Sequence, residues 1–172
     1  MIEVRVQSLG IDQSSKSPVV ILQETNGERM LPIWIGPSEA NAIAMELAGM
    51  KFERPLTHDL AAALIRGLGG ALTRVLITRV QSNTYFAELV IQRGNEVFSI
   101  DARPSDSIAI ALRMRARVFT SEELLTPNAI EMDPDQSLPD IPKARDEETL
   151  SAEQLQDYLR KLNPEDLGRF NP

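Results

Sequence analysis

The sequence predicts an α+β domain in which two βββα units follow one another along the chain. A strand that runs into Pro-Ser-acid at the head of an apolar helix occurs twice, first at Pro37 and again, 67 residues later, at Pro104. At residues 2–6, apolar and polar residues alternate with a period of two, which indicates a strand with one buried face, and further strand-like runs precede each of these segments. After each proline, apolar residues recur at helical spacing.

The two segments also match position by position. A fixed offset of 67 residues aligns Gly27 with Gly94, Ile33 with Ile100, Pro37 and Ser38 with Pro104 and Ser105, Glu39 with Asp106, and Phe52 with Phe119. A match at a constant offset indicates a duplicated unit. The second copy has Asp101 and Arg103 where the first has Trp34 and Gly36. We expect the shared positions to hold the scaffold and the differing positions to carry chemistry.

Three strands are predicted in the first unit, followed by a helix. The alternation at residues 2–6 gives the first strand, and residues 18–24 and 30–35 give the next two, joined by a hairpin turn at Asn26 and Gly27. The helix begins near Pro37, whose fixed dihedral angle suits the first helical position, and ends by Gly49.

A second helix links the units, and the plan then repeats. Thr57 is the predicted N-cap of the linking helix, which glycines end at residues 67–70. The second unit has strands at residues 72–81, 85–92 and 96–102 and a helix from residue 104 to about residue 115. Both unit helices are apolar around much of their girth, so we expect them to be buried between layers.

The predicted domain spans residues 1–127 and is followed by an acidic, proline-containing linker at residues 128–148 and a short helical tail at residues 149–172. The linker composition is typical of a segment that cannot bury enough apolar surface to fold. Ser151 and Gln154 form a capping box for a helix with an apolar stripe (Leu155, Tyr158, Leu159 and Leu162). A helix this short must dock on the body, on another subunit or on a protein partner.

Charge and composition limit the function classes. The net charge is −7, but residues 1–127 hold 13 basic and 14 acidic residues, whereas residues 128–172 hold 5 and 11. A near-neutral body predicts that any nucleic-acid contact is weak or local, because such binding depends on neutralising phosphates. The absence of cysteine excludes disulfides and thiolate chemistry, and a single histidine excludes a multi-histidine metal site within one chain.

We expect a cytoplasmic protein with no membrane segment. No apolar run approaches the roughly 20 residues that cross a bilayer, and the first residues alternate like a strand instead of forming a charged and then apolar leader. A duplicated architecture with apolar helices leaves surface for self-association into a homo-oligomer.

The sharpest chemical feature lies around Asp101, Arg103, Ser105 and Asp106 at the end of a strand and the start of a helix. Asp101 and Asp106, with Glu39 from the first unit, are candidate ligands of Mg²⁺ or Mn²⁺, and Arg103 with Ser105 could bind a phosphate at the positive end of the helix dipole. The alternative is structural, because acids favour a first helical turn and an arginine beside an aspartate commonly forms a salt bridge.

Arg54, His58 and Asp59 form a second candidate group at the start of the linking helix. His58 could act as a general base because its ordinary pKa lies near neutrality, and Arg54 could contact substrate. The alternative is that these are ordinary polar residues of a first turn. Arg113, Arg115 and Arg117 form either a basic patch for phosphates or a solvated helix end. Trp34, between two isoleucines, is predicted to be a packing residue, with a base-stacking platform as the alternative.

Three motifs in order resemble the bifunctional nuclease domain, a family also catalogued as a domain of unknown function. They are Leu31-Pro32-Ile33-Trp34-Ile35-Gly36 with Glu39-Ala40, Arg54-Pro55 with Thr57-His58-Asp59-Leu60, and Ile100-Asp101-Ala102-Arg103-Pro104-Ser105-Asp106 with Ala109-Ile110-Ala111. The match covers about residues 1–125. The resemblance implies an α+β domain and nuclease activity on both RNA and DNA.

Two hypotheses of function follow. In the first, the chain is a metal-assisted nuclease in which Asp101 and Asp106, with Glu39 or Asp59, hold the metal, Arg103 stabilises charge on phosphorus, and His58 moves a proton. In the second, it is a non-catalytic binding or regulatory module, whose acids and arginines are internal salt bridges and whose tail recruits a partner. An open cleft at Arg103 favours the first hypothesis, and a sealed ion pair favours the second.

Overall fold

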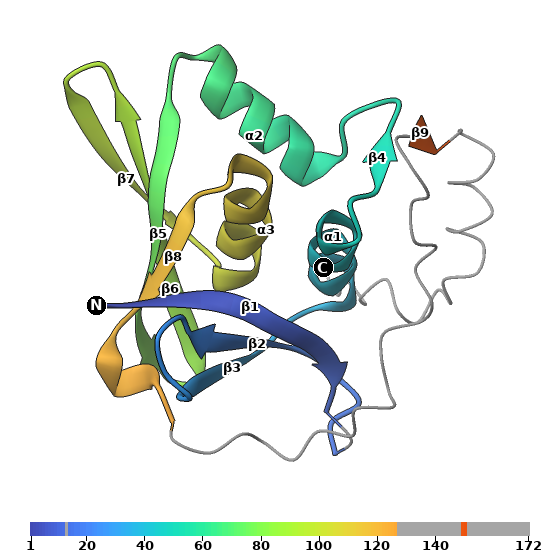
Figure 1. The fold of residues 1–172 in the computed structure, drawn as a ribbon, viewed down its shortest axis with the longest axis vertical. Helices are drawn as coiled ribbons and strands as arrows, with labels where there is room; N and C mark the ends of the chain where they lie inside the picture. The colour runs from blue at the N-terminus through green and yellow to red at the C-terminus, as the bar shows by residue number, and fades with distance from the viewer. Residues whose placement is uncertain (13, 127–148, 151–172) are drawn as a thin grey trace.

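A computed structural model describes residues 1–12, 14–126 and 149–150 of the chain, and it has one large sheet with three helices (Figure 1). The helices are α1 (Pro37–Leu47), α2 (Thr57–Gly67) and α3 (Pro104–Met114). The strands are β1 (Ile2–Ile11), β2 (Pro18–Glu24), β3 (Met30–Trp34), β4 (Lys51–Phe52), β5 (Ala71–Gln81), β6 (Thr84–Arg93), β7 (Glu96–Ala102), β8 (Arg117–Thr120) and β9 (Thr149–Leu150), and a 3₁₀ turn η1 spans Glu122–Leu124.

The large sheet has seven strands in the order β3-β2-β1-β8-β5-β6-β7. Its pairs are antiparallel except for β5 and β8, which run parallel, so the sheet is mixed. The predicted α+β class is therefore confirmed. Each half of the sheet is a three-strand meander, and β8 joins the two halves by pairing with β1 on one side and with β5 on the other.

Each meander leads directly into a helix, so the elements follow the predicted plan of two βββα units linked by a helix. Helix α1 begins at Pro37 and helix α3 begins at Pro104, as the repeated segment predicts. In both helices the proline occupies the first turn, where its missing N–H removes no helical hydrogen bond. The origin of the two units by duplication stays a prediction.

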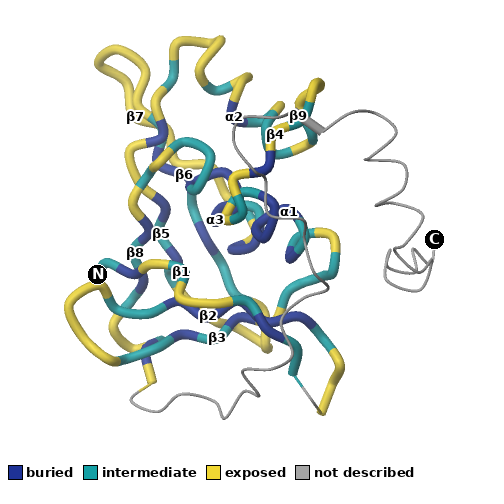
Figure 2. Tube along the Cα trace, turned by 45° about the vertical axis from the view of Figure 1, so that its right-hand side comes forward, coloured by how far each residue is buried: buried dark blue, intermediate teal, exposed yellow. Residues whose placement is uncertain are grey.

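Helix α3 is the centre of the molecule. The two halves of the sheet lie at an angle, and the three helices occupy the inside of that angle (Figure 1). Helix α3 contacts β5, β6 and β8 on one side and α1 and α2 on the other. Its residues from Ser107 to Ala111 are all buried, as the dark blue trace shows in Figure 2. The expectation that both unit helices are buried is met most fully by α3, because it lies between the sheet and the other two helices.

The start of α2 differs from the prediction. Its N-cap is Leu56 and not Thr57, which is already the first helical residue. The capping contact comes from Asp59, whose Oδ2 accepts a hydrogen bond of 2.9 Å from the backbone N–H of Leu56. In a capping box, the side chain at the third helical position accepts a hydrogen bond from the N-cap N–H, and Asp59 makes this contact here although the N-cap itself has no hydroxyl.

Strand β7 forms as predicted, but its large apolar residues do not face the core. Val97, Phe98 and Ile100 are all exposed, because β7 is the edge strand of the described sheet. Phe98 and Ile100 line an open groove of about 220 Å³, which is also lined by Leu64 of α2 and by Leu68, the C-cap of that helix. Helix α3 therefore packs on the centre of the sheet and leaves these apolar side chains of β7 exposed.

The sequence did not predict β4, β8 or β9. Strand β9 (Thr149–Leu150) pairs in parallel with β4 (Lys51–Phe52). The predicted linker at residues 128–148 and the tail helix beyond Ser151 lie outside the described residues. Among the residues that the structure describes, no helix is long and apolar enough to span a membrane.

Candidate active site

The first turns of all three helices border one cavity of about 540 Å³. Helix α1 contributes Ser38 and Glu39, helix α2 contributes Thr57 and His58, and Arg103 and Asp106 come from the start of α3. Ala42, Met45, Pro55, Leu56 and Arg113 complete the lining. Because the N-terminus of a helix carries the positive end of its dipole, three converging N-termini favour an anion in this cavity.

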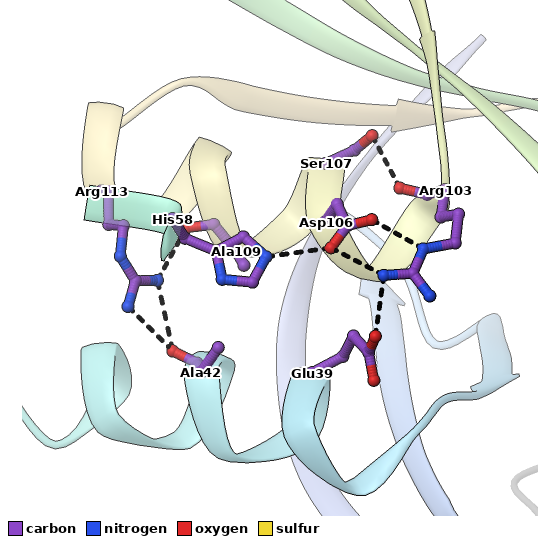
Figure 3. A network of polar contacts seen from close by, with 8 residues as sticks. All are labelled: Glu39, Ala42, His58, Arg103, Asp106, Ser107, Ala109 and Arg113. Carbon is purple, nitrogen blue, oxygen red and sulfur yellow. Dashed lines mark hydrogen bonds and ion pairs between the residues drawn. The ribbon is translucent and has the colours of Figure 1, made fainter. Parts of the chain in front are cut away.

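Four of the lining side chains form one network of hydrogen bonds and ion pairs (Figure 3). Arg103 Nε donates to Asp106 Oδ2 at 2.7 Å, and its Nη2 donates to Glu39 Oε1 at 2.7 Å and to Asp106 Oδ1 at 3.2 Å. His58 Nε2 lies 2.9 Å from Asp106 Oδ1. Asp106 therefore joins the histidine to the arginine, and the arginine joins the two carboxylates.

The local sequence explains this convergence. Arg103 is the N-cap of α3 and has an extended backbone, so its side chain leaves the strand just where the chain turns into the helix. Ser107 Oγ donates to the Arg103 carbonyl at 2.9 Å and helps to fix that turn. Glu39 and Asp106 occupy equivalent positions in the first turns of α1 and α3, and packing of these two helices brings their carboxylates to the same arginine.

The network keeps the Asp106 carboxylate ionised. Burial by itself raises the pKa of Asp106, but hydrogen bonds from Arg103 and His58, together with the charges of these groups, lower it by more. The net pKa lies below the ordinary value of 3.8. The hydrogen bond to Asp106 in turn raises the pKa of Arg103. At neutral pH, Asp106 is therefore an acceptor only, and Arg103 is a cation with a 66% exposed side chain.

Asp59 does not line the cavity, although the sequence placed it among the candidate catalytic and metal-binding residues. One of its oxygens accepts from the Leu56 N–H, and the other pairs with Arg113. Arg113 also donates to the carbonyl oxygens of Ala42 at 3.2 Å and Ala109 at 3.0 Å, and its side chain is only 6% exposed. Asp59 and Arg113 thus clamp the three helices together, and Arg113 is not part of an exposed basic patch.

The other predicted site residues neither line this cavity nor join the network. Asp101 is exposed on β7 opposite Glu88 of β6 and is not in the cavity lining. Ser105 is buried in the first turn of α3, and Arg54 is exposed in the loop that leads to Pro55. The motifs were enough to predict His58 and Arg103 as site residues. Their proximity to Glu39 could not be predicted in this way, because it depends on the packing of α1 on α3.

The predicted set of three metal ligands is not brought together. Within the described residues, no group of three or more His, Cys, Asp or Glu side chains could hold a metal ion. Asp101 belongs to the strand, whereas the chain turns at Arg103 before it reaches Asp106. Glu39 and Asp106 remain as a pair of carboxylates, both bonded to Arg103 Nη2.

Comparison with known proteins gives the family. The model of the bifunctional nuclease domain matches residues 20–133. A Mycobacterium tuberculosis protein that is itself named only as uncharacterized is 41% identical over 164 residues, which cover 95% of this chain and 96% of that protein. Bifunctional nuclease 1 of rice (Oryza sativa subsp. japonica) is 24% identical over 92% of this chain, which corresponds to 46% of the rice protein. Bifunctional nuclease 1 of Arabidopsis thaliana is 26% identical over 62% of this chain and 34% of its own length.

The family match covers α1, α2 and α3 and therefore all four side chains of the network. The M. tuberculosis relative aligns along nearly its whole length, so the similarity is not confined to a short motif. The chain belongs to the bifunctional nuclease domain family.

Proposed function

We propose that this protein hydrolyses phosphodiester bonds of nucleic acid in the cavity between α1, α2 and α3. The observation that carries the proposal is the exposure of Arg103, which extends into an open cavity while it holds Glu39 and Asp106. A guanidinium at three helix N-termini suits a phosphodiester anion. Family membership and the names of the plant relatives agree with this reaction.

His58 is the proposed general base. Since the Asp106 carboxylate can only accept, Nε2 of a neutral His58 carries the hydrogen that it shares with Asp106. The lone pair of that tautomer then lies on Nδ1, which can take a proton from water. Asp106 holds the ring in position and stabilises the imidazolium that forms, as the carboxylate does in a catalytic triad.

Arg103 is the proposed phosphate-binding residue. The oxygen of the activated water forms a bond to phosphorus while the bond from phosphorus to one ester oxygen breaks, and His58 returns its proton to the departing alkoxide. Negative charge gathers on the phosphoryl oxygens during this exchange. A cation that is already ordered by Glu39 and Asp106 stabilises that charge without needing to reorganise.

A divalent cation, Mg²⁺ or Mn²⁺, could still be held at this site by two carboxylates in place of the three that the sequence predicted. Mg²⁺ is commonly held by one or two carboxylates together with substrate phosphates, and Glu39 with Asp106 could supply the protein ligands. When bound there, it would act as a Lewis acid on the phosphate. Arg103 is paired with both of these carboxylates, so metal and arginine would compete for them.

A binding module is the second candidate function. Every charged group in the network already has an internal partner, as a purely structural cluster would have. Under this alternative, nucleic acid or a protein partner is bound by the chain but not cleaved. The nuclease is preferred because Asp106 also holds His58, a candidate general base, at the same cavity, and binding alone would not require one.

The test is cleavage of single-stranded RNA and plasmid DNA by the wild-type chain and by His58→Ala, each with Mg²⁺, with Mn²⁺ and with a chelator. We expect the variant to lose at least about 100-fold in rate, the usual contribution of a general base. Glu96→Gln is the matched control, because Glu96 forms only an exposed pair with Arg93 on the β6–β7 hairpin. Equal cleavage by all three proteins, or cleavage by none, would refute the proposed function.

A further inference from the structure

We propose that a second cavity, next to the first, binds one unpaired nucleobase of the substrate, with Trp34 as its stacking surface. The inference rests on the proposed function, which it narrows to nucleic acid with at least one unpaired base. The cavity has a volume of about 240 Å³ and is lined by Ile33, Trp34, Ile35, Gly36, Asn83, Thr84, Tyr85, Arg103, Pro104 and Ser105. This volume is below the ~300 Å³ at which pockets for drug-sized ligands begin, so it suits one small planar group.

Trp34 is placed as a binding surface and not as a core residue. Leu31 and Ile33 of the same strand are buried, but Trp34 itself is 46% exposed at the end of β3, which does not fit the packing role that the sequence favoured. Its indole Nε1 donates to Asp12 Oδ2 at 3.3 Å. Hydrogen bonds from Ser15 lower the pKa of Asp12, so the acceptor is ionised at neutral pH. The ring is therefore held in place before any ligand arrives, which lowers the entropic cost of stacking.

Arg103 connects the two cavities, because it lines both. The guanidinium that would hold the scissile phosphate therefore stands beside the space that would hold a base. In a nucleotide, base and phosphate are joined through one sugar, so two adjacent cavities of this kind match its two recognisable parts. Pocket binding of a base by an aromatic ring beside a cationic phosphate contact is the usual arrangement for single-stranded nucleic acid.

The opposite wall supplies polar groups. Ser82 and Asn83 form the two-residue turn between β5 and β6, and both have a positive φ, of 48° and 59°. Such a turn holds the strands in a fixed register, so Asn83 is carried rigidly at the edge of the cavity. An amide both donates and accepts hydrogen bonds, as the Watson–Crick edge of a base requires. That edge is free only when the base is unpaired, so the arrangement selects against duplex.

The test uses the fluorescence of Trp34, the only tryptophan in the chain. The wild-type protein is titrated with a phosphorothioate thymidine decamer, which resists cleavage, and with the same sequence as a duplex. We expect the single strand to quench Trp34 emission and the duplex to quench it much less. In anisotropy with a labelled decamer, Trp34→Ala should bind about 5- to 150-fold more weakly, the equivalent of the ~1–3 kcal/mol of one stacked base.

Trp34→Phe should recover most of the affinity, and Phe98→Ala, which removes an exposed aromatic ring on β7 away from the cavity, should bind like the wild type. The inference would be overturned if the single strand did not quench Trp34 emission, or if the duplex quenched it equally. It would also be overturned if Trp34→Ala and Trp34→Phe both bound the decamer as tightly as Phe98→Ala does. If the decamer quenches Trp34 emission but the wild-type chain cleaves neither RNA nor plasmid DNA, the base site is supported and the nuclease is refuted. If the chain cleaves nucleic acid but the decamer does not quench the emission, the nuclease is supported and the base site is refuted.

Discussion

Arg103 brings together the two parts of the candidate site at the scale of single residues. It contacts Glu39 and Asp106, and it lines both the cavity that contains His58 and the cavity that contains Trp34. Asp106 is the second central residue, since it accepts from both Arg103 and His58. Loss of either residue would disconnect the network.

The lowered pKa of Asp106 predicts how stability depends on pH. A carboxyl group whose pKa is lower in the folded state stabilises the protein above its ordinary pKa of 3.8 and loses this contribution as the pH falls through the folded value. Asp106→Asn should therefore reduce the free energy of unfolding at pH 7 by about 1 kcal/mol, and the difference from the wild type should shrink below about pH 4.

Urea unfolding at pH 7, 5 and 3 measures this dependence. Asp101→Asn is the matched control because it removes an exposed aspartate from β7, and it should leave the unfolding free energy unchanged at each pH to within about 0.5 kcal/mol. An offset for Asp106→Asn that stays constant from pH 7 to pH 3 would contradict the account of the network.

The sequence predicted some site residues better than others, for physical reasons. The Pro-Ser-acid motif identified Glu39 and Asp106, because a helix start places its first-turn acids predictably. Asp101, which the sequence grouped with them, lies on β7 and not in the lining of their cavity, because the chain turns at Arg103 before the helix begins. The sequence favoured packing for Trp34 because its neighbours are apolar, whereas its place at the end of the strand leaves it exposed.

At the scale of elements, the clamp of Arg113 and Asp59 holds the three helices at the angles that form the cavity. Arg113 belongs to α3, Asp59 to α2, and the carbonyl of Ala42 to α1. No pattern in the sequence distinguishes this arginine from the exposed Arg115 and Arg117 that follow it. A cation near the end of a helix is ordinary, and its burial depends on the packing of two other helices.

Arg113→Met should lower the free energy of unfolding by about 3 kcal/mol, because it leaves the partly buried Asp59 without its cation and removes the hydrogen bonds that link α3 to the Ala42 carbonyl of α1. Methionine has an adaptable side chain that fills much of the same space. Urea unfolding provides the measurement. The control Arg93→Met removes an exposed ion pair and should cost less than about 1 kcal/mol. Equal costs for the two variants would rule out the clamp.

The order and type of the elements could largely be predicted from the sequence, but the sheet that they form could not. Periodicity identified β1, β2, β3, β5, β6 and β7 and all three helices to within a few residues. Strand β8 was missed because four residues are too few for alternation to be distinctive. Yet β8 pairs with both β1 and β5, so it determines how the two halves combine.

At the scale of the whole molecule, the site exists only because the two units and the linking helix fold together. Glu39 comes from the first unit, His58 from the linking helix, and Arg103 with Asp106 from the second unit. Most of the net negative charge of the chain comes from residues 128–172, so residues 1–127, which form the cavity, are close to neutral. A local phosphate contact at Arg103 is consistent with this near-neutral body.

The most direct test of the central claim is the single-turnover rate of phosphodiester cleavage by His58→Ala, Asp106→Asn and the double variant, relative to the wild type. Residues that act as one catalytic unit are strongly non-additive. We predict that each single variant loses at least about 100-fold and that the double variant is within about 3-fold of the slower single variant. A double variant whose loss equals the product of the two single losses, or either single variant that cleaves at the wild-type rate, would contradict the claim that His58 and Asp106 form the site of cleavage.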